Sequence, residues 1–91
     1  MNPIRPFWYY TYVLISETTG KFYTWSTTEL KKRATEHNNG LVPSTKYKRP
    51  LQLIYFEAYL SKDDAFRRER YLKSGMGKRY LRNCLKGGII E

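Results

Sequence analysis

The sequence contains one cysteine, few acidic residues and no long apolar run, and each shortage excludes a class of protein. Cys84 is the only cysteine, so neither an intrachain disulfide nor a thiolate metal cage can form. A reducing compartment is then expected, and we predict a cytoplasmic protein. No apolar stretch approaches the ~20 residues of a membrane span, and the N-terminus lacks the apolar core of a signal peptide. Leu81 and Leu85 flank Cys84 at helical spacing, which favours a small core residue over a nucleophile.

The shortage of acidic residues gives the chain a strong positive charge. Seventeen basic residues face 8 acidic ones, the net charge is +9 and the isoelectric point is near 9.8. Lysine and arginine bind phosphates with release of counterions, so nucleic acid is the expected partner. A basic protein that docks on a ribosome or on a membrane surface is the alternative, and we favour nucleic acid with no membrane partner.

The length and the composition predict one small folded domain. The chain has 91 residues, of which 41% are apolar, and its nine tyrosines, four phenylalanines and two tryptophans argue against a disordered tail. Pro3 and Pro6 favour an extended arm over residues 1–8. We expect a single domain over residues 9–86 and a C-terminal tail over residues 87–91.

Three segments rich in β-branched and aromatic residues are predicted strands, and they cover residues 8–16, 21–25 and 51–58. The first is apolar on both faces, which predicts a central position. The turn between the first two contains Gly20, which can adopt positive φ, so these strands are expected to form a hairpin.

Three helices are predicted from capping and stop signals. Ser26 and Glu29 have capping-box spacing, so a helix is expected to start there and to end at residues 38–40. Ser61 and Asp64 predict a second helix that stops at residues 74–75. A third helix is predicted over residues 78–85, with Tyr80 or Leu81, Cys84 and Leu85 facing inward. The order β-β-α-β-α-α predicts an α+β fold, in which helices cover a hairpin plus one strand.

The first predicted helix carries polar residues on its inward face. Leu30, Arg33, Ala34 and His37 follow the i, i+3, i+4, i+7 pattern of a single helical face. One interpretation is structural, with the Arg33 stem packed, its head in solvent and His37 hydrogen-bonded at the helix end. The other is an anion site formed by the pair.

Glu69 is a carboxylate on a partly apolar stripe of the second helix. It either forms a salt bridge within the run Arg67-Arg68-Glu69-Arg70 or offers a hard oxygen ligand to Mg²⁺ or Mn²⁺. Such ions take one or two carboxylates and complete their shell with water and substrate phosphate.

A basic loop and a group of tyrosines are further candidates. Residues 41–50 contain Lys46, Tyr47, Lys48 and Arg49, a pattern that suits a phosphate backbone and an unstacked base, and that also suits a solvated loop. Lys32, on the outer face of the first helix, joins this nucleic-acid-binding set. Tyr10, Tyr12 and Tyr23 lie on the hairpin strands, either as core aromatics or as hydroxyls near Arg33 and His37.

Taken in order, these residues resemble the GIY-YIG nuclease superfamily. Tyr10-Thr11-Tyr12 is followed by Tyr23-Thr24-Trp25 and then by Arg33, His37 and Glu69. The strings Leu30-Lys31-Lys32-Arg33, Glu36-His37-Asn38-Asn39-Gly40, Ser44-Thr45-Lys46-Tyr47 and the helix from Arg67 to Gly75 add to the resemblance. The series resembles the small stand-alone members, relatives of the UvrC N-terminal domain and of Slx-type nucleases.

The resemblance implies a three-stranded antiparallel sheet flanked by helices, and metal-dependent hydrolysis of phosphodiester bonds in DNA during repair, recombination or processing. Branched and single-stranded DNA are both candidate substrates. Tyr12 and Tyr23 would be the motif tyrosines, Arg33 would bind the scissile phosphate, and Glu69 would hold one Mg²⁺ or Mn²⁺ ion. His37 matches a histidine used near the nucleophile in some branches. Which group takes the proton from the attacking water stays open.

Trp25 stands where the superfamily has glycine, and it defines the alternatives. An indole there could block substrate, shift Tyr23 or stack on a base. The second hypothesis is therefore a catalytically impaired nucleic-acid-binding module on the same fold. A third is an adaptor whose basic face docks on another nuclease.

Overall fold

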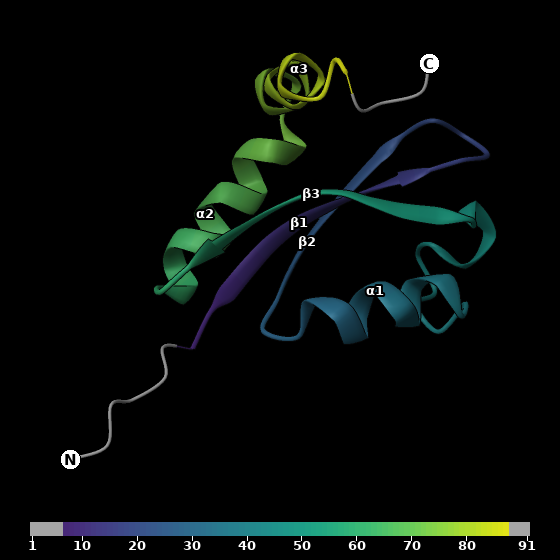
Figure 1. Ribbon diagram of the computed structural model, residues 1–91, viewed down its shortest axis with the longest axis horizontal. Helices are drawn as coiled ribbons and strands as arrows, with labels where there is room; N and C mark the ends of the chain where they lie inside the picture. The colour runs from purple at the N-terminus through teal and green to yellow at the C-terminus, as the bar shows by residue number, and fades with distance from the viewer. Residues whose placement is uncertain (1–6, 88–91) are drawn as a thin grey trace.

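A three-stranded antiparallel sheet forms the centre of the molecule. The computed structural model describes residues 7–87, so the predicted arm falls largely, and the predicted tail almost wholly, outside the described residues. The strands are β1 (Tyr9–Ser16), β2 (Phe22–Thr27) and β3 (Leu51–Tyr59), in the spatial order β2-β1-β3 (Figure 1). The predicted central position of the first strand is confirmed.

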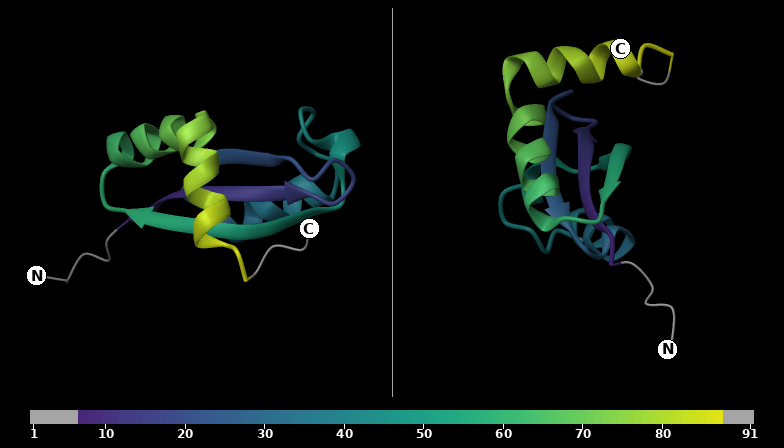
Figure 2. Two further views of the ribbon diagram at one scale, coloured as in Figure 1. Left: turned by 90° about the horizontal axis from the view of Figure 1, so that it is seen from above. Right: turned by 90° about the vertical axis from the view of Figure 1, so that its left-hand side faces the viewer.

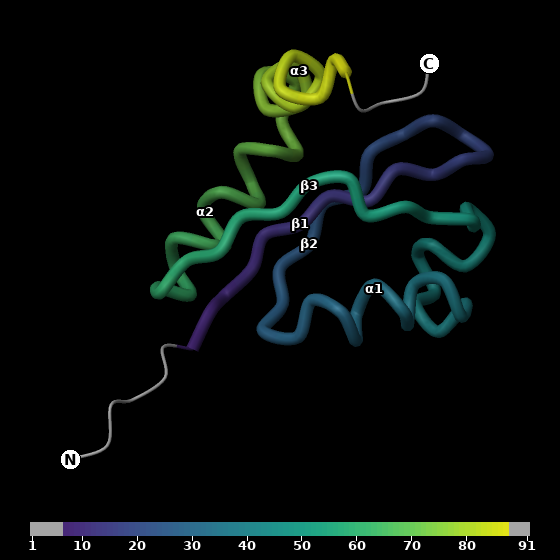
Figure 3. Tube along the Cα trace, viewed as in Figure 1, coloured from purple at the N-terminus to yellow at the C-terminus, as the bar shows by residue number. Residues whose placement is uncertain are grey.

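The helices cover both faces of this sheet. Helix α1 (Leu30–Asn38) lies on one side, and α2 (Lys62–Lys73) and α3 (Gly75–Cys84) lie on the other (Figure 2). A short 3₁₀ helix, η1 (Lys46–Lys48), interrupts the return from α1 to β3, which Figure 3 traces as a tight loop. The α+β fold and the order β-β-α-β-α-α are confirmed. Within residues 7–87, no helix has the length and apolar character that crossing a membrane requires.

Alternation along β1 divides the core into two layers, because successive side chains point to opposite faces of the sheet. On the α1 side, Tyr12, Leu14 and Leu51 are buried, with Tyr23, Trp25 and Leu30 packed against them. On the other side, Val13 and Phe22 pack with Leu72 of α2 and Leu81 of α3. Each layer is small, so single residues in it carry much of the packing.

A polar network closes the second layer at β3. Arg68 of α2 binds the Glu57 carboxylate through two nitrogens, with Nε 2.9 Å from Oε1 and Nη2 3.0 Å from Oε2. The hydroxyls of Tyr55 and Tyr59 donate to the same carboxylate, and the Arg68 guanidinium lies 4.9 Å from the centre of the Tyr80 ring. Burial would raise the pKa of Glu57, but the hydrogen bonds from Arg68 and the tyrosines hold it below its usual value. This network attaches α2 to the sheet.

The predicted capping box at Ser26 is wrong. Ser26 lies inside β2, paired with Thr11, and the strand continues to Thr27. The N-cap of α1 is Glu29, which makes no side-chain cap hydrogen bond, and its backbone N–H donates to Thr27 Oγ1 at 3.0 Å. The Ser26 hydroxyl, which a capping box would use, instead donates to Glu69 Oε1 of α2 at 2.6 Å.

The predicted boundaries of the last two helices are partly correct. Ser61 caps α2 as expected, accepting the backbone N–H of Asp64. However, α3 begins at Gly75, three residues before the predicted start, because Ser74 ends α2 and also caps α3 by accepting from Gly77 N at 3.1 Å. Cys84 is exposed, so its predicted core position is wrong, whereas Leu81 is fully buried.

Candidate active site

A buried hydrogen bond joins Tyr12 to His37. Tyr12 lies in the middle of the central strand, on the face that α1 covers, and His37 lies in the last turn of α1. The Tyr12 hydroxyl is 3.0 Å from His37 Nε2, and both residues are fully buried. The helical spacing therefore placed His37 correctly on the inward face.

The far side of the imidazole is also bonded. His37 Nδ1 lies 2.8 Å from Thr45 Oγ1, and Thr45 is fully buried in the loop after α1. Thr45 is part of a string that supports the family resemblance, but no local pattern predicted this contact, because Thr45 lies in a loop, eight positions after His37.

Arg33 sits one turn before His37, at the rim of the same face. Its side chain is 38% exposed, and its Nη1 donates to Glu36 Oε1 at 2.9 Å. Only His37 of the predicted pair is buried, because the longer arginine side chain extends toward solvent. The guanidinium is thus the accessible cation beside the Tyr12–His37 pair.

The charges around this pair fix its protonation. Burial lowers the pKa of His37 and the Arg33 charge lowers it further, so the imidazole is neutral at pH 7. Burial raises the pKa of Tyr12, while the positive charge of Arg33 opposes that rise and Glu69 adds to it. The pair therefore consists of a protonated phenol and a neutral imidazole that can accept a proton.

Glu69 lies on α2, on the other face of the sheet from the Tyr12–His37 pair, and it contacts the edge strand β2. Its Oε1 accepts a hydrogen bond from Ser26 Oγ at 2.6 Å, and Lys73 Nζ lies 2.8 Å from its Oε2. The side chain is 18% exposed, whereas Lys73 is 52% exposed. Glu69 forms no hydrogen bond with Tyr12, Arg33 or His37. Sequence reasoning missed Ser26 as a site residue, because it interpreted Ser26 as a helix cap. The pairing of β2 with β1 is what places the Ser26 side chain beside Glu69.

The donor set around Glu69 suits a particular kind of metal site. Across residues 7–87 no group of three or more His, Cys, Asp or Glu side chains could hold an ion. A divalent ion held through one carboxylate must complete its shell with water and substrate phosphate, which is the usual behaviour of Mg²⁺ in phosphoryl-transfer sites. Glu69, with the Ser26 hydroxyl against one oxygen and an exchangeable lysine against the other, fits such an ion.

Trp25 stands between the Tyr12–His37 pair and Lys73. It is paired with Tyr12 across the hairpin, its ring centre is 5.3 Å from that of His37, and Lys73 Nζ lies 5.8 Å from its ring. Its Nε1 is buried without a hydrogen-bond partner among the described residues, and the same holds for the Tyr23 hydroxyl. In this conformation Trp25 helps to seal His37 from solvent.

The predicted nucleic-acid-binding residues fall into two places. Lys46, Tyr47 and Lys48 form η1, where Tyr47 is 86% exposed and Lys48 Nζ lies 5.7 Å from the Tyr23 ring. Arg49 follows and donates from Nε to Lys46 O at 2.7 Å. This basic loop adjoins the end of the hairpin that carries Tyr23.

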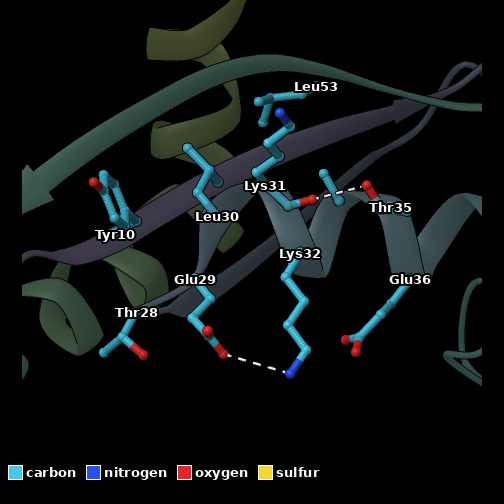
Figure 4. Close-up of a pocket in the computed structure, with 10 residues that line it drawn as sticks. Tyr10, Thr28, Glu29, Leu30, Lys31, Lys32, Thr35, Glu36 and Leu53 are labelled. Atoms are coloured by element: carbon cyan, nitrogen blue, oxygen red, sulfur yellow. Dashed lines mark hydrogen bonds and ion pairs between the residues drawn. The ribbon is translucent and has the colours of Figure 1, made fainter.

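Lys32 lies apart from that loop, near the start of α1. It pairs with Glu29 at 3.7 Å and lines an open hollow of about 860 Å³ between α1 and the sheet, together with Tyr10 and Leu53 (Figure 4). Of the candidate site residues, Lys32 and Tyr10 line this hollow, whereas Tyr12, Arg33 and His37 do not. The hollow is therefore separate from the Tyr12–His37 pair.

Comparison with known proteins identifies several similar chains. A model of the GIY-YIG catalytic domain matches residues 8–81. A UPF0213 protein from Staphylococcus saprophyticus is 35% identical over 69 residues, covering 75% of this chain and 84% of that protein. One from Streptococcus agalactiae serotype V is 42% identical over 67 residues, covering 70% and 73%. The solution NMR structure of a UPF0213 protein from Bacillus halodurans superposes with a TM-score of 0.54 at 35% identity, covering 89% of this chain and 87% of that chain.

Proposed function

The chain belongs to the GIY-YIG catalytic domain family, and we propose that it is a metal-dependent endonuclease that hydrolyses phosphodiester bonds in DNA. The observation that carries this proposal is the hydrogen-bonded pair of Tyr12 and His37 with Arg33 at its rim. Together they offer a proton acceptor and a phosphate-binding cation within one helical turn. The net charge of +9 supports a polyanionic substrate.

Arg33 is the residue that we assign to the scissile phosphate. Its guanidinium is partly exposed and is held by the Glu36 carboxylate, which a phosphate can replace as a bidentate partner. In the transition state, negative charge accumulates on the oxygens of phosphorus, and a preplaced cation stabilises that charge more than it stabilises the substrate.

The Tyr12–His37 pair supplies the proton path. The attacking water gives its proton to the Tyr12 oxygen as the phenolic proton passes to His37 Nε2, which is neutral and 3.0 Å away. The hydroxide attacks phosphorus in line with the leaving oxygen. Because Tyr12 and His37 are fully buried, this step requires Trp25 to move away from His37.

Glu69 is the residue that we assign to the metal. With its Oε1 held by Ser26, it would hold one Mg²⁺ or Mn²⁺ ion, whose charge would stabilise the leaving oxygen. Lys73 would exchange its carboxylate partner for a substrate phosphate when the ion binds. Lys46, Tyr47, Lys48 and Arg49 would follow the flanking strand, with Tyr47 available for stacking on a base.

A second candidate function is a nucleic-acid-binding module without activity. The observation that favours it is the complete burial of Tyr12 and His37 beneath a contact with Trp25, at a position where the family motif has glycine. If the indole does not move, the basic loop can still bind a strand but the reacting groups stay covered.

A cleavage assay separates the two functions. Labelled single-stranded, duplex and branched DNA, and matching RNA, are incubated with Mg²⁺ or Mn²⁺ and with wild-type protein, Arg33→Gln or Glu69→Gln. We expect loss of one transition-state donor to lower the rate by about 10²–10³-fold. Arg67→Gln is the control, because Arg67 is also accessible to solvent, at 70% exposed, and also pairs with a carboxylate three residues away.

The outcomes discriminate clearly. Equal rates for Arg33→Gln and Arg67→Gln would remove Arg33 from the site, and cleavage by Glu69→Gln at the wild-type rate would remove the metal role. Salt-sensitive binding with no cleavage of any substrate would favour the binding module.

A further inference from the structure

Thr45 occupies an unusual position for a loop hydroxyl. It is fully buried, and its Oγ1 lies 2.8 Å from His37 Nδ1. Its backbone is fixed on both sides: Thr45 N donates to Val42 O at 3.1 Å, and Lys48 N donates to Thr45 O at 3.0 Å. The hydroxyl is therefore held against the imidazole by the fold of the loop.

A count of donors and acceptors assigns the protons. Thr45 Oγ1 has a second contact, to Val42 O at 3.4 Å, and a carbonyl can only accept. If the Thr45 hydroxyl donates to Val42 O, its oxygen accepts from His37 Nδ1–H. The neutral imidazole then has a lone pair on Nε2, which accepts the phenolic proton of Tyr12.

The opposite tautomer leaves the network incomplete. With the proton on Nε2, the imidazole would donate to the Tyr12 oxygen, and the phenolic proton would need another acceptor. Among the described residues, His37 is the only hydrogen-bond acceptor for the Tyr12 hydroxyl, and Arg33 bonds to the Tyr12 oxygen as a donor. Arg33, the neighbouring cation whose charge acts on Tyr12, can only donate. A buried donor without an acceptor is costly, so the fold favours Nδ1–H.

We infer that Thr45 is a positioning residue that fixes the Nδ1–H tautomer of His37 and so makes Nε2 the proton acceptor for Tyr12. This role rests on the proposed function, since the tautomer matters for catalysis only if His37 receives the phenolic proton. The same residue begins the segment that carries Lys46, Tyr47 and Lys48, so the basic loop and the proton path share one anchor.

Nitrogen NMR tests the tautomer directly. His37 is the only histidine in the chain, so ¹⁵N-histidine labelling gives one pair of ring nitrogen signals with no assignment problem. At pH 7.5 or above we expect the wild-type spectrum to show a protonated Nδ1 and an unprotonated Nε2. A wild-type spectrum of the Nε2–H form would overturn the inference without any variant.

Three variants complete the test, each measured by NMR and by cleavage. Thr45→Val keeps the volume and removes the acceptor, so we expect the Nε2–H form and a rate lower by about 10–100-fold, the usual effect of losing a residue that orients a functional histidine. Thr45→Ser keeps the hydroxyl and should restore both the tautomer and the rate. Ser44→Ala changes the exposed neighbour and should alter neither.

The readouts separate failure of the inference from failure of the proposed function. Nδ1–H persisting in Thr45→Val at the wild-type rate overturns the inference and leaves the nuclease proposal intact. A switched tautomer with an unchanged rate overturns the catalytic role of the tautomer. If wild-type protein cleaves nothing, the nuclease proposal and with it the catalytic role of Thr45 fail, whatever the spectra show. If Thr45→Val does not fold, Thr45→Ser and the wild-type spectrum still decide the tautomer.

Discussion

Replacing Trp25 tests whether this side chain both packs the site and covers it. Trp25 belongs to the core layer of Tyr12, Leu14 and Leu51, and its ring contacts His37. Two substitutions separate the effects: Trp25→Gly restores the residue type of the family motif and removes the indole, whereas Trp25→Phe keeps an aromatic ring and removes only the larger ring system and Nε1.

The expected stabilities follow from the burial of the indole. Truncation of a core tryptophan costs about 3–5 kcal/mol, and the lower end applies because Trp25 is only partly buried. A glycine within a strand adds roughly 0.5–1 kcal/mol, so Trp25→Gly should lose about 3.5–4 kcal/mol. For Trp25→Phe the change should stay within about 1 kcal/mol, because the lost packing is offset by removing a buried N–H that has no acceptor within residues 7–87.

The assay measures unfolding and nicking on the same samples. Urea titrations give the free energy of unfolding, and nicking is measured at a temperature where each variant is folded. We expect Trp25→Gly to nick faster per folded molecule than wild type, with Trp25→Phe close to wild type. A loss below about 1 kcal/mol for Trp25→Gly would refute the packing on His37. A folded Trp25→Gly with an unchanged or lower rate would refute the idea that the indole obstructs the site.

Two further predictions concern stability. Glu57→Gln should lower the free energy of unfolding by about 2 kcal/mol, because it leaves the partly buried Arg68 without its carboxylate. Since the folded pKa of Glu57 is depressed, this contribution is present above about pH 4.5 and is lost as the pH falls through the folded pKa, so urea midpoints of wild type and variant should converge in acid. Gly77→Ala should cost about 3 kcal/mol or more, because its Cβ would lie 2.0 Å from Tyr71 O, while Gly75→Ala meets nothing within 4 Å. Equal melting temperatures for these two alanine variants would contradict the packing at the start of α3.

The candidate site consists of short segments that are far apart in the sequence and that the fold brings into contact. His37 reached its inward position through helical periodicity alone, and Tyr12 reached the buried face through strand alternation. The contact between His37 and Tyr12 depends on how α1 packs on the sheet, and no local sequence pattern predicts that packing. Ser26 shows the same limit: its spacing to Glu29 matches a capping box, yet the pairing of β2 with β1 places it against Glu69, 43 residues away.

The sequence by itself determined the element order, the central strand, the inward face of α1 and the resemblance to the family, because periodicity, turn residues and motif order are local properties of the chain. Tertiary structure alone decided that Cys84 is exposed, that Thr45 holds the imidazole and that Trp25 lies against His37. These outcomes depend on which distant surfaces meet. A hydroxyl or an indole acquires its role from the partner that the fold supplies, and the linear sequence does not specify that partner.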